Sequence, residues 1–196
     1  MTTPILSDAD YIVSDVSVSH STPNFHTESL NMVSNTMSRG LHQLEVQFKV
    51  HLVNADDIKR FQALMLNIRG RLNPFKLSLQ DQTDGKGQCN PLYTNAKPLL
   101  SNALAIGNNK MVLSGISGTI KAGSMFHFPN DAKVYVLLED AKNNQTVSFF
   151  PSTRQAHEVK ERLNFSVEPL LRLEDDSFKL TYSNASEITL NAREVL

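Results

Sequence analysis

Residues 44–79 read LEVQFKVHLVNADDIKRFQALMLNIRGRLNPFKLSL, and this stretch decides the fold of the chain. Its first part alternates apolar and polar residues: Leu44, Val46, Phe48, Val50 and Leu52 are separated by Glu45, Gln47, Lys49 and His51. A period of two is typical of a strand with one face on a core and the other in water. We therefore predict a half-buried strand over residues 44–52.

After this strand the period changes to that of a helix. Asn54 is a residue type favoured at the N-cap, and Asp56 and Asp57 follow in the first turn, where carboxylates suit the helix dipole. The apolar residues of one helix face are Ile58, Phe61, Leu64, Met65 and Ile68. Arg69 suits the C-terminal end of the dipole, and Gly70 can adopt the left-handed conformation that ends a helix. We predict that this apolar stripe is core.

Alternation returns at Phe75, Leu77 and Leu79, which predicts a return strand. Strand, helix and strand together make a scaffold, and none of its residues is placed for catalysis. Residues 80–98 then combine Gly, Pro and polar residues without periodicity, which predicts a linker.

Short β-type runs follow the linker at 111–113, at 120 with 125–128, at 134–138 and at 147–150. Even spacing of short strands between turns predicts a small barrel or sandwich. Residues 151–162 are polar and predict a loop or a single helical turn. We expect further alternation at 163–167, a hairpin of 171–173 with 178–182 around Glu174, Asp175 and Asp176, and a last strand from Ile188 to the end.

Composition excludes several classes of protein. The chain has 196 residues and a formal net charge of −1, whereas a protein that coats nucleic acid carries a strong basic excess. Cys89 is the only cysteine, which excludes an intrachain disulfide and suits a reducing cytoplasm. The N-terminus lacks the cationic start and apolar core of a signal peptide, and no apolar run is long enough to span a bilayer.

Four segments, in the same order, resemble the minor and distal tail proteins of long-tailed bacteriophages, with the distal tail proteins of the T-five-like siphophages as the nearest group. They are the strand–helix–Arg-Gly–strand unit at 44–79, FHTESLNMVSNTMSRG at 25–40, IKAGSMFHFPNDAKVYVLLEDA at 120–141 and DSFKLTYSNASEITLNAREVL at 176–196. The resemblance covers nearly the whole chain. Ser124 departs from it, because the family often has Asp after this glycine.

The resemblance implies a mainly β fold with one central α-helix and an inserted small OB-like β-barrel. It implies a discontinuous tail-ring domain, residues 1–80 with 168–196, and an inserted domain, residues 81–167. The implied function is structural: a six-membered ring with a central channel, joining the tail tube protein to the baseplate hub, tip or fibre proteins. The implied location is the tail tip of the virion, after assembly in the host cytoplasm.

Each candidate for chemistry has a simpler structural interpretation. Three consecutive acids, Glu174 to Asp176, are typical of a solvated turn. The histidines are His20, His26, His42, His51, His127 and His157, and none of them forms a pair with metal-ligand spacing. We expect His42 and His51 to face solvent, and His127 to be a structural residue of a strand.

The remaining motifs also lack a partner for catalysis. Residues 84–87, Asp-Gly-Lys-Gly, lack the rest of a phosphate-binding loop, Cys89 has no nearby histidine, and the Ser/Gly turn at 114–118 lacks the order of a nucleophile elbow. We predict no catalytic, cofactor-binding or metal-binding residue, and therefore no enzyme.

The alternative is a carbohydrate- or nucleic-acid-binding module built on the OB-like barrel. The aromatics available to it are Phe126, Phe128, Tyr135, Phe149 and Phe150, and its basic residues Lys110, Lys121, Lys133 and Lys142 are spread singly among the turns. Because these aromatics alternate as core residues do, we expect them to be core, with a host surface glycan as a minor possible partner. Residues 23–40 are polar, and we expect an arm that becomes ordered only against a neighbour.

Overall fold

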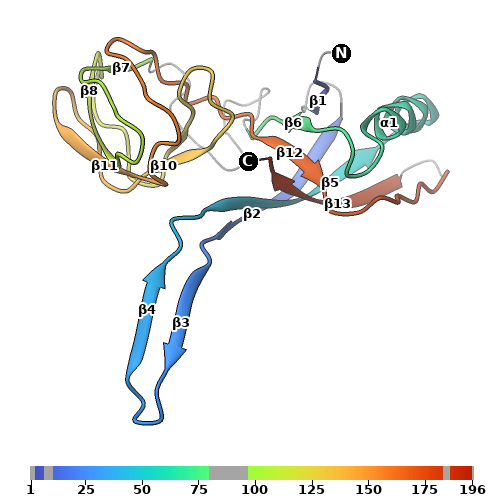
Figure 1. The fold of residues 1–196 in the computed structure, drawn as a ribbon. Coiled ribbons are helices and arrows are strands. Elements are labelled where there is room, and N and C mark those ends of the chain that lie inside the picture. The colour runs from blue at the N-terminus through green and yellow to red at the C-terminus, as the bar shows by residue number, and fades with distance from the viewer. Residues whose placement is uncertain (1–2, 7–10, 80–96, 183–185, 196) are drawn as a thin grey trace.

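The computed structural model describes residues 3–6, 11–79, 97–182 and 186–195. Within this part of the chain the protein is mainly β with one helix (Figure 1). The strands form a mixed six-stranded sheet curved as a half-barrel, a separate five-stranded antiparallel sheet that curls into a barrel-like unit, and a two-stranded hairpin. This confirms the predicted fold class.

The large sheet has the strand order β1-β6-β12-β13-β5-β2. Its strands are β1 (Ile5–Leu6), β2 (Ile12–Ser21), β5 (Gln43–Leu52), β6 (Phe75–Leu77), β12 (Leu170–Leu173) and β13 (Ser186–Glu194). Every neighbouring pair is antiparallel except β1 with β6. The predicted strands at 44–52 and 75–77 are therefore confirmed, and the long strand β2 forms one edge of the sheet.

The helix α1 (Ala55–Ile68) begins at the predicted N-cap, and its C-cap is Arg69, one residue before the predicted Gly70. The Asn54 side chain accepts hydrogen bonds from the amides of Asp56 and Asp57, at 3.0 and 2.9 Å. At the other end both Arg69 and Gly70 are left-handed, with φ of 53° and 61°. The stripe Ile58, Phe61, Met65 and Ile68 is buried with the inward side chains of β5 and β13, and Leu64 packs against the same cluster. The predicted core face of α1 is confirmed.

One predicted element is wrong. Residues 178–182 do not pair with β12 as a hairpin; they cross the helix as an irregular segment, and β12 pairs instead with β6 and β13. Phe178 and Leu180 still pack against the core, and the Tyr182 hydroxyl donates a hydrogen bond to Gln62 of α1 at 2.7 Å. The alternating apolar residues Phe178 and Leu180 are partly buried against the core, and such packing does not require a ladder of backbone hydrogen bonds.

The five-stranded sheet has the order β7-β8-β11-β10-β9. Its strands are β7 (Leu99–Leu100), β8 (Lys110–Ser114), β9 (Met125–Phe126), β10 (Tyr135–Leu137) and β11 (Thr146–Phe150). Residues 162–164 bridge its two edges, because Arg162 pairs with Leu99 and Asn164 pairs with His127. The predicted short strands after residue 110 are confirmed, and residues 151–162 include no helical turn.

The described residues form two hydrophobic cores. One lies between α1 and the six-stranded sheet, and the other fills the barrel. Met125, Val134 and Val167 come from the barrel segment but belong to the first core, so the two units are packed together. The division at residues 81 and 168 stays a prediction, and most of the predicted linker, residues 80–96, lies outside the described residues.

A hairpin projects from the sheet (Figure 1). Its strands are β3 (Asn24–Glu28) and β4 (Ser34–Ser38), which follow β2 and precede β5 in the chain. Every residue from 22 to 41 is exposed. Residues 23–40 form an ordered two-stranded ribbon in the single chain, whereas we expected an arm that becomes ordered only against a neighbour.

Candidate interaction surface

The hairpin of β3 and β4, which we call the arm, has two chemically different faces. Residues directly opposite in an antiparallel pair share a face, and Phe25 lies opposite Met37. The other face is polar: His26 lies opposite Thr36 and accepts or donates a hydrogen bond to its hydroxyl at 3.1 Å. Phe25 and Met37 are 59% and 63% exposed. Within the paired strands, the apolar side chains Phe25 and Met37 therefore lie exposed on the same face of the arm.

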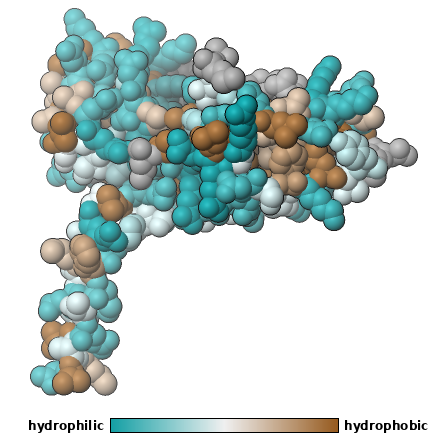
Figure 2. All heavy atoms as spheres, turned by 45° about the vertical axis from the view of Figure 1, so that its right-hand side comes forward, coloured by the Kyte–Doolittle hydropathy of each residue, from teal (hydrophilic) through white to brown (hydrophobic). Residues whose placement is uncertain are grey.

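The tip of the arm is also apolar. Leu30 is 104% exposed, Met32 is 85% exposed and Val33 is 59% exposed. Figure 2 shows hydrophobic atoms beside hydrophilic ones at the free end of the arm. The turn is fixed by backbone hydrogen bonds from Met32 to Ser29 at 2.9 Å and from Ser29 to Val33 at 3.0 Å. A large exposed apolar group on a defined turn is typical of a contact surface.

The base of the arm is held by two histidines. His20 is the last residue but one of β2 and His42 directly precedes β5, so they lie where the arm leaves these two strands. Their rings stack at 5.2 Å, and His20 Nδ1 lies 3.0 Å from His42 Nε2. Farther along the arm, the Arg39 guanidinium lies 5.1 Å from the centre of the Phe25 ring.

His42 also contacts the barrel. Its ring meets Phe150 of β11 edge-on at 5.3 Å, and its carbonyl accepts a hydrogen bond from Lys133 Nζ at 3.0 Å. Lys133 forms a buried ion pair with Glu194, the last residue of β13. The Glu194 carboxylate also accepts from the amides of Val134, at 2.8 Å, and Leu44, at 3.1 Å. Arm, sheet and barrel therefore meet in one buried polar junction.

Burial controls the protonation of this junction. The pKa of His42 is lowered to about 4, mainly by burial and then by the nearby Lys133 and His20. Partial burial also lowers the pKa of His20, against the opposing effect of Glu194. Burial lowers the pKa of Lys133, while Glu194 opposes that change. The folded junction therefore favours the neutral form of both histidines beside the lysine–glutamate pair.

Two of these residues were misplaced by the sequence analysis. His42 is buried, at 4% exposure, although we expected it to face solvent. His42 lies two positions before Leu44 and four before Val46, so the alternation of apolar and polar residues in β5 places it on the core side. Lys133 was expected among scattered surface lysines but is 2% exposed. No local pattern reveals this, because its partner Glu194 lies 61 residues away.

The predicted acidic turn lies at the surface, where arginines contact it. Glu174 pairs with Arg193, and its carbonyl accepts from the Arg71 side chain. Asp176 accepts from the Arg71 amide at 3.1 Å. These contacts tie the turn to the end of the helix. Within the described ranges no three His, Cys, Asp or Glu side chains are grouped so that they could hold a metal ion.

The other sequence candidates have simple environments. Asp84–Gly87 and Cys89 lie outside the described residues. His127 is buried beside β9 and its Nδ1 lies 2.8 Å from the Lys133 carbonyl, as expected of a structural residue. His51 is half-buried and lies 2.6 Å from the Ser14 hydroxyl. The helix in the described part of the chain is too short and polar to cross a membrane.

The barrel aromatics are core, as predicted, with one exception. Phe126, Phe128, Tyr135 and Phe149 are 0–2% exposed and pack on one another with ring centres 5.0 to 5.9 Å apart. Phe150 is 37% exposed and faces His42 at the junction. The four buried rings cannot serve as a platform for stacking a base or a sugar.

Comparison with known proteins gives no relative. The sequence matches no family model and no curated protein. The function must therefore be argued from the surfaces described above.

Proposed function

We propose that this protein is a structural, non-enzymatic subunit of a bacteriophage tail tip. It forms a ring, with six copies implied by the sequence resemblance, that joins the tail tube to the tip or baseplate hub. The observation that carries the proposal is the arm: an ordered hairpin that projects from the sheet with one apolar face exposed. A two-stranded hairpin is marginally stable alone, so a subunit that projects one is built to pack it on a partner.

The edge of the sheet supports the same function. β2 has ten residues and pairs on only one side in the described structure, with β5. An edge strand offers free amide and carbonyl groups for pairing with another chain. Edge and arm are continuous in sequence, so one neighbour can contact both. Repetition of such a contact by a fixed rotation closes into a ring.

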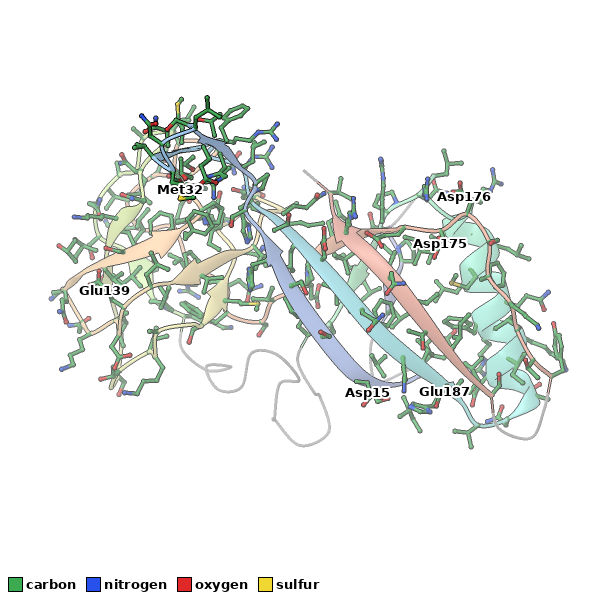
Figure 3. All side chains as sticks on the ribbon, turned by 90° about the horizontal axis from the view of Figure 1, so that it is seen from below. Asp15, Met32, Glu139, Asp175, Asp176 and Glu187 are labelled. Atoms are coloured by element: carbon green, nitrogen blue, oxygen red, sulfur yellow. The ribbon has the colours of Figure 1, made fainter. Side chains whose placement is uncertain are left out.

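The outer face of the large sheet suits the wall of a central channel. Apart from the exposed Ile12, its side chains are mostly polar, and several are linked across strands: Gln47 donates to Asn191 at 2.9 Å, and Lys49 lies 2.9 Å from Asp15 and 3.7 Å from Glu187. Asp15 and Glu187 are labelled on this face in Figure 3. Because the lysine is matched by carboxylates, this face would be wetted by water and would bind passing DNA weakly.

The alternative, a glycan- or nucleic-acid-binding module, has less support. Base or sugar stacking requires exposed aromatic rings, and four of the five candidate rings in the barrel are buried. We therefore propose the tail tube protein and the hub, tip or fibre proteins as partners in the virion, with assembly in the host cytoplasm.

Electron microscopy of the purified protein tests this function. We expect ring-shaped particles with six-fold averages at high protein concentration or with the tail partners, because contacts of a free subunit can be weak. Labelling within virions should place several copies at the tail tip. A single copy per particle, or absence from the tail, would exclude the proposal.

A further inference from the structure

We propose that the tip of the arm, Leu30 and Met32, docks into an apolar hollow between α1 and β13 of a second copy of this chain. This inference rests on the proposed function and names the contact that would hold neighbouring copies together. It is carried by three observations: the conformation of the tip, the chemistry of the hollow, and their positions on the molecule.

The tip keeps a methionine where the backbone disfavours it. Met32 has a φ of 59°, a left-handed conformation that suits Gly or Asn in a three-residue hairpin turn. Within its own chain the Met32 side chain gains almost no stabilising contact, since it is 85% exposed. Backbone strain at an exposed turn indicates a function, because the methionine side chain must then make a favourable contact outside its own chain. Residues 29–35 also carry no charge, so the tip can enter an apolar site without desolvating an ion.

The hollow lies beside the C-terminal end of α1. Its volume is about 220 Å³, and its apolar lining includes Met65, Leu173, Phe178, Ile188 and Leu190. Asp175, Asp176 and Lys179 lie at the same hollow. Ser177, Thr189 and Asn191 also line the hollow, so it combines apolar side chains with polar and charged ones, as protein-binding pockets do.

The arm of the same chain is directed away from this hollow. In Figure 1 the arm leaves the sheet away from α1, and in Figure 3 Met32 lies far from Asp175 and Asp176. One chain thus presents two different apolar surfaces in separate places, a projection and a hollow. Contact between unlike surfaces is heterologous, so it links copies head to tail and closes as a ring or continues as a filament.

The exposed apolar area of the arm is adequate for such a contact. Phe25, Leu30, Met32, Val33 and Met37 are each at least 59% exposed. Together they make a patch of several hundred square ångströms, on the order of the ~800 Å² that each partner buries in a stable interface. A second copy supplies an apolar surface of matching character at the hollow, which is why we assign the arm to it.

Two tip variants and one hollow variant test the inference. Met32→Asn suits the left-handed turn, so it should preserve the hairpin while removing the docking side chain. Met32→Asp adds a charge. Ser177→Trp fills the hollow from an exposed position, with Ser152→Trp on the barrel as its control. We expect the first three to weaken self-association by about 30-fold, as at an interface hot spot, and the control to leave it unchanged.

Mixing the variants identifies a head-to-tail contact. Met32→Asp mixed with Ser177→Trp retains one intact contact, so sedimentation should show dimers and no larger ring. In a Cys89→Ser background, oxidation should cross-link Met32→Cys of one copy to Ser177→Cys of another. Rings that persist in all tip and hollow variants would overturn this inference and leave the proposed function standing. A wild-type protein that self-associates under no condition, including within virions, would overturn both.

Discussion

Lys133 of the barrel and Glu194 of β13 form an ion pair with side chains only 2% and 0% exposed. Glu194 also accepts hydrogen bonds from the amides of Val134 and Leu44, and Lys133 donates to the His42 carbonyl. A charge pair can be stable in such surroundings only when its remaining hydrogen-bonding positions are filled. Here the partners come from two further stretches of chain, residues 42–44 and Val134, so the pair fixes the barrel to the sheet at the base of the arm.

Removal of one partner of this pair should therefore be costly. Lys133→Met leaves the Glu194 carboxylate buried without its cation, and we expect the free energy of unfolding to fall by about 3–5 kcal/mol in urea titrations. Adding Glu194→Gln should recover part of the loss, because glutamine accepts hydrogen bonds without a charge. Lys121→Met is the matched control: its pair with Asp140, at 2.9 Å, is exposed to solvent, so its removal should change stability far less than removal of Lys133. Equal losses for both lysines would refute the argument.

Acid should weaken the same junction. The pKa of His42 is lowered to about 4, below its ordinary value of 6.5, so its neutral form is favoured in the folded state. This contribution to stability is complete above pH 6.5 and is lost as the pH falls from 6.5 towards 4. Unfolding free energies at pH 7.5, 5.5 and 4.5 should fall less steeply for His42→Phe than for the wild type. Identical pH slopes in the two proteins would show that His42 does not titrate in this way.

The apolar stripe of α1 should behave as core. Phe61 is fully buried and meets the Tyr11 ring edge-on at 5.5 Å. Phe61→Ala should lower the free energy of unfolding by about 3–5 kcal/mol through the cavity it leaves. Leu66→Ala, on the 60% exposed side of the same helix, should change it by no more than ~0.5 kcal/mol. A small effect at Phe61 together with loss of assembly would mean that the stripe faces another subunit.

Gly70 should tolerate no side chain. It is left-handed, with a φ of 61°, and a Cβ atom there would lie 2.6 Å from Asp176 Cα. Gly70→Ala must therefore strain its own backbone and displace residues 174–178, which form part of the hollow. Gly40→Ala shares the left-handed backbone, with a φ of 65°, but its Cβ atom would meet nothing within 4 Å. We expect ~1–2 kcal/mol of destabilisation at Gly40 by thermal unfolding and clearly more at Gly70.

Local patterns in the sequence determined the scaffold. The alternation of residues 44–52 and the helical stripe from Ile58 to Ile68 each indicate an element with one buried face. The spacing of apolar residues along the chain is enough to show this. The N-cap at Asn54 was predictable for the same reason, since a cap is a contact between residues a few positions apart, whereas the C-cap is Arg69, one residue before the predicted Gly70. The same alternation, continued two residues before Leu44, places His42 on the buried face.

Only the tertiary structure decided where the surfaces for interaction lie. The pairing of Lys133 with Glu194, the stacking of His20 on His42 and the contact of Asp176 with Gly70 join residues that are 61, 22 and 106 positions apart. No periodicity encodes such distances, because the chain between two partners can take many paths. Residues 178–182 have a strand-like alternation, yet they cross α1 without pairing, since the same apolar side chains can be buried against a helix. The sequence specifies which side chains must leave water; the packing of distant segments decides what each one meets.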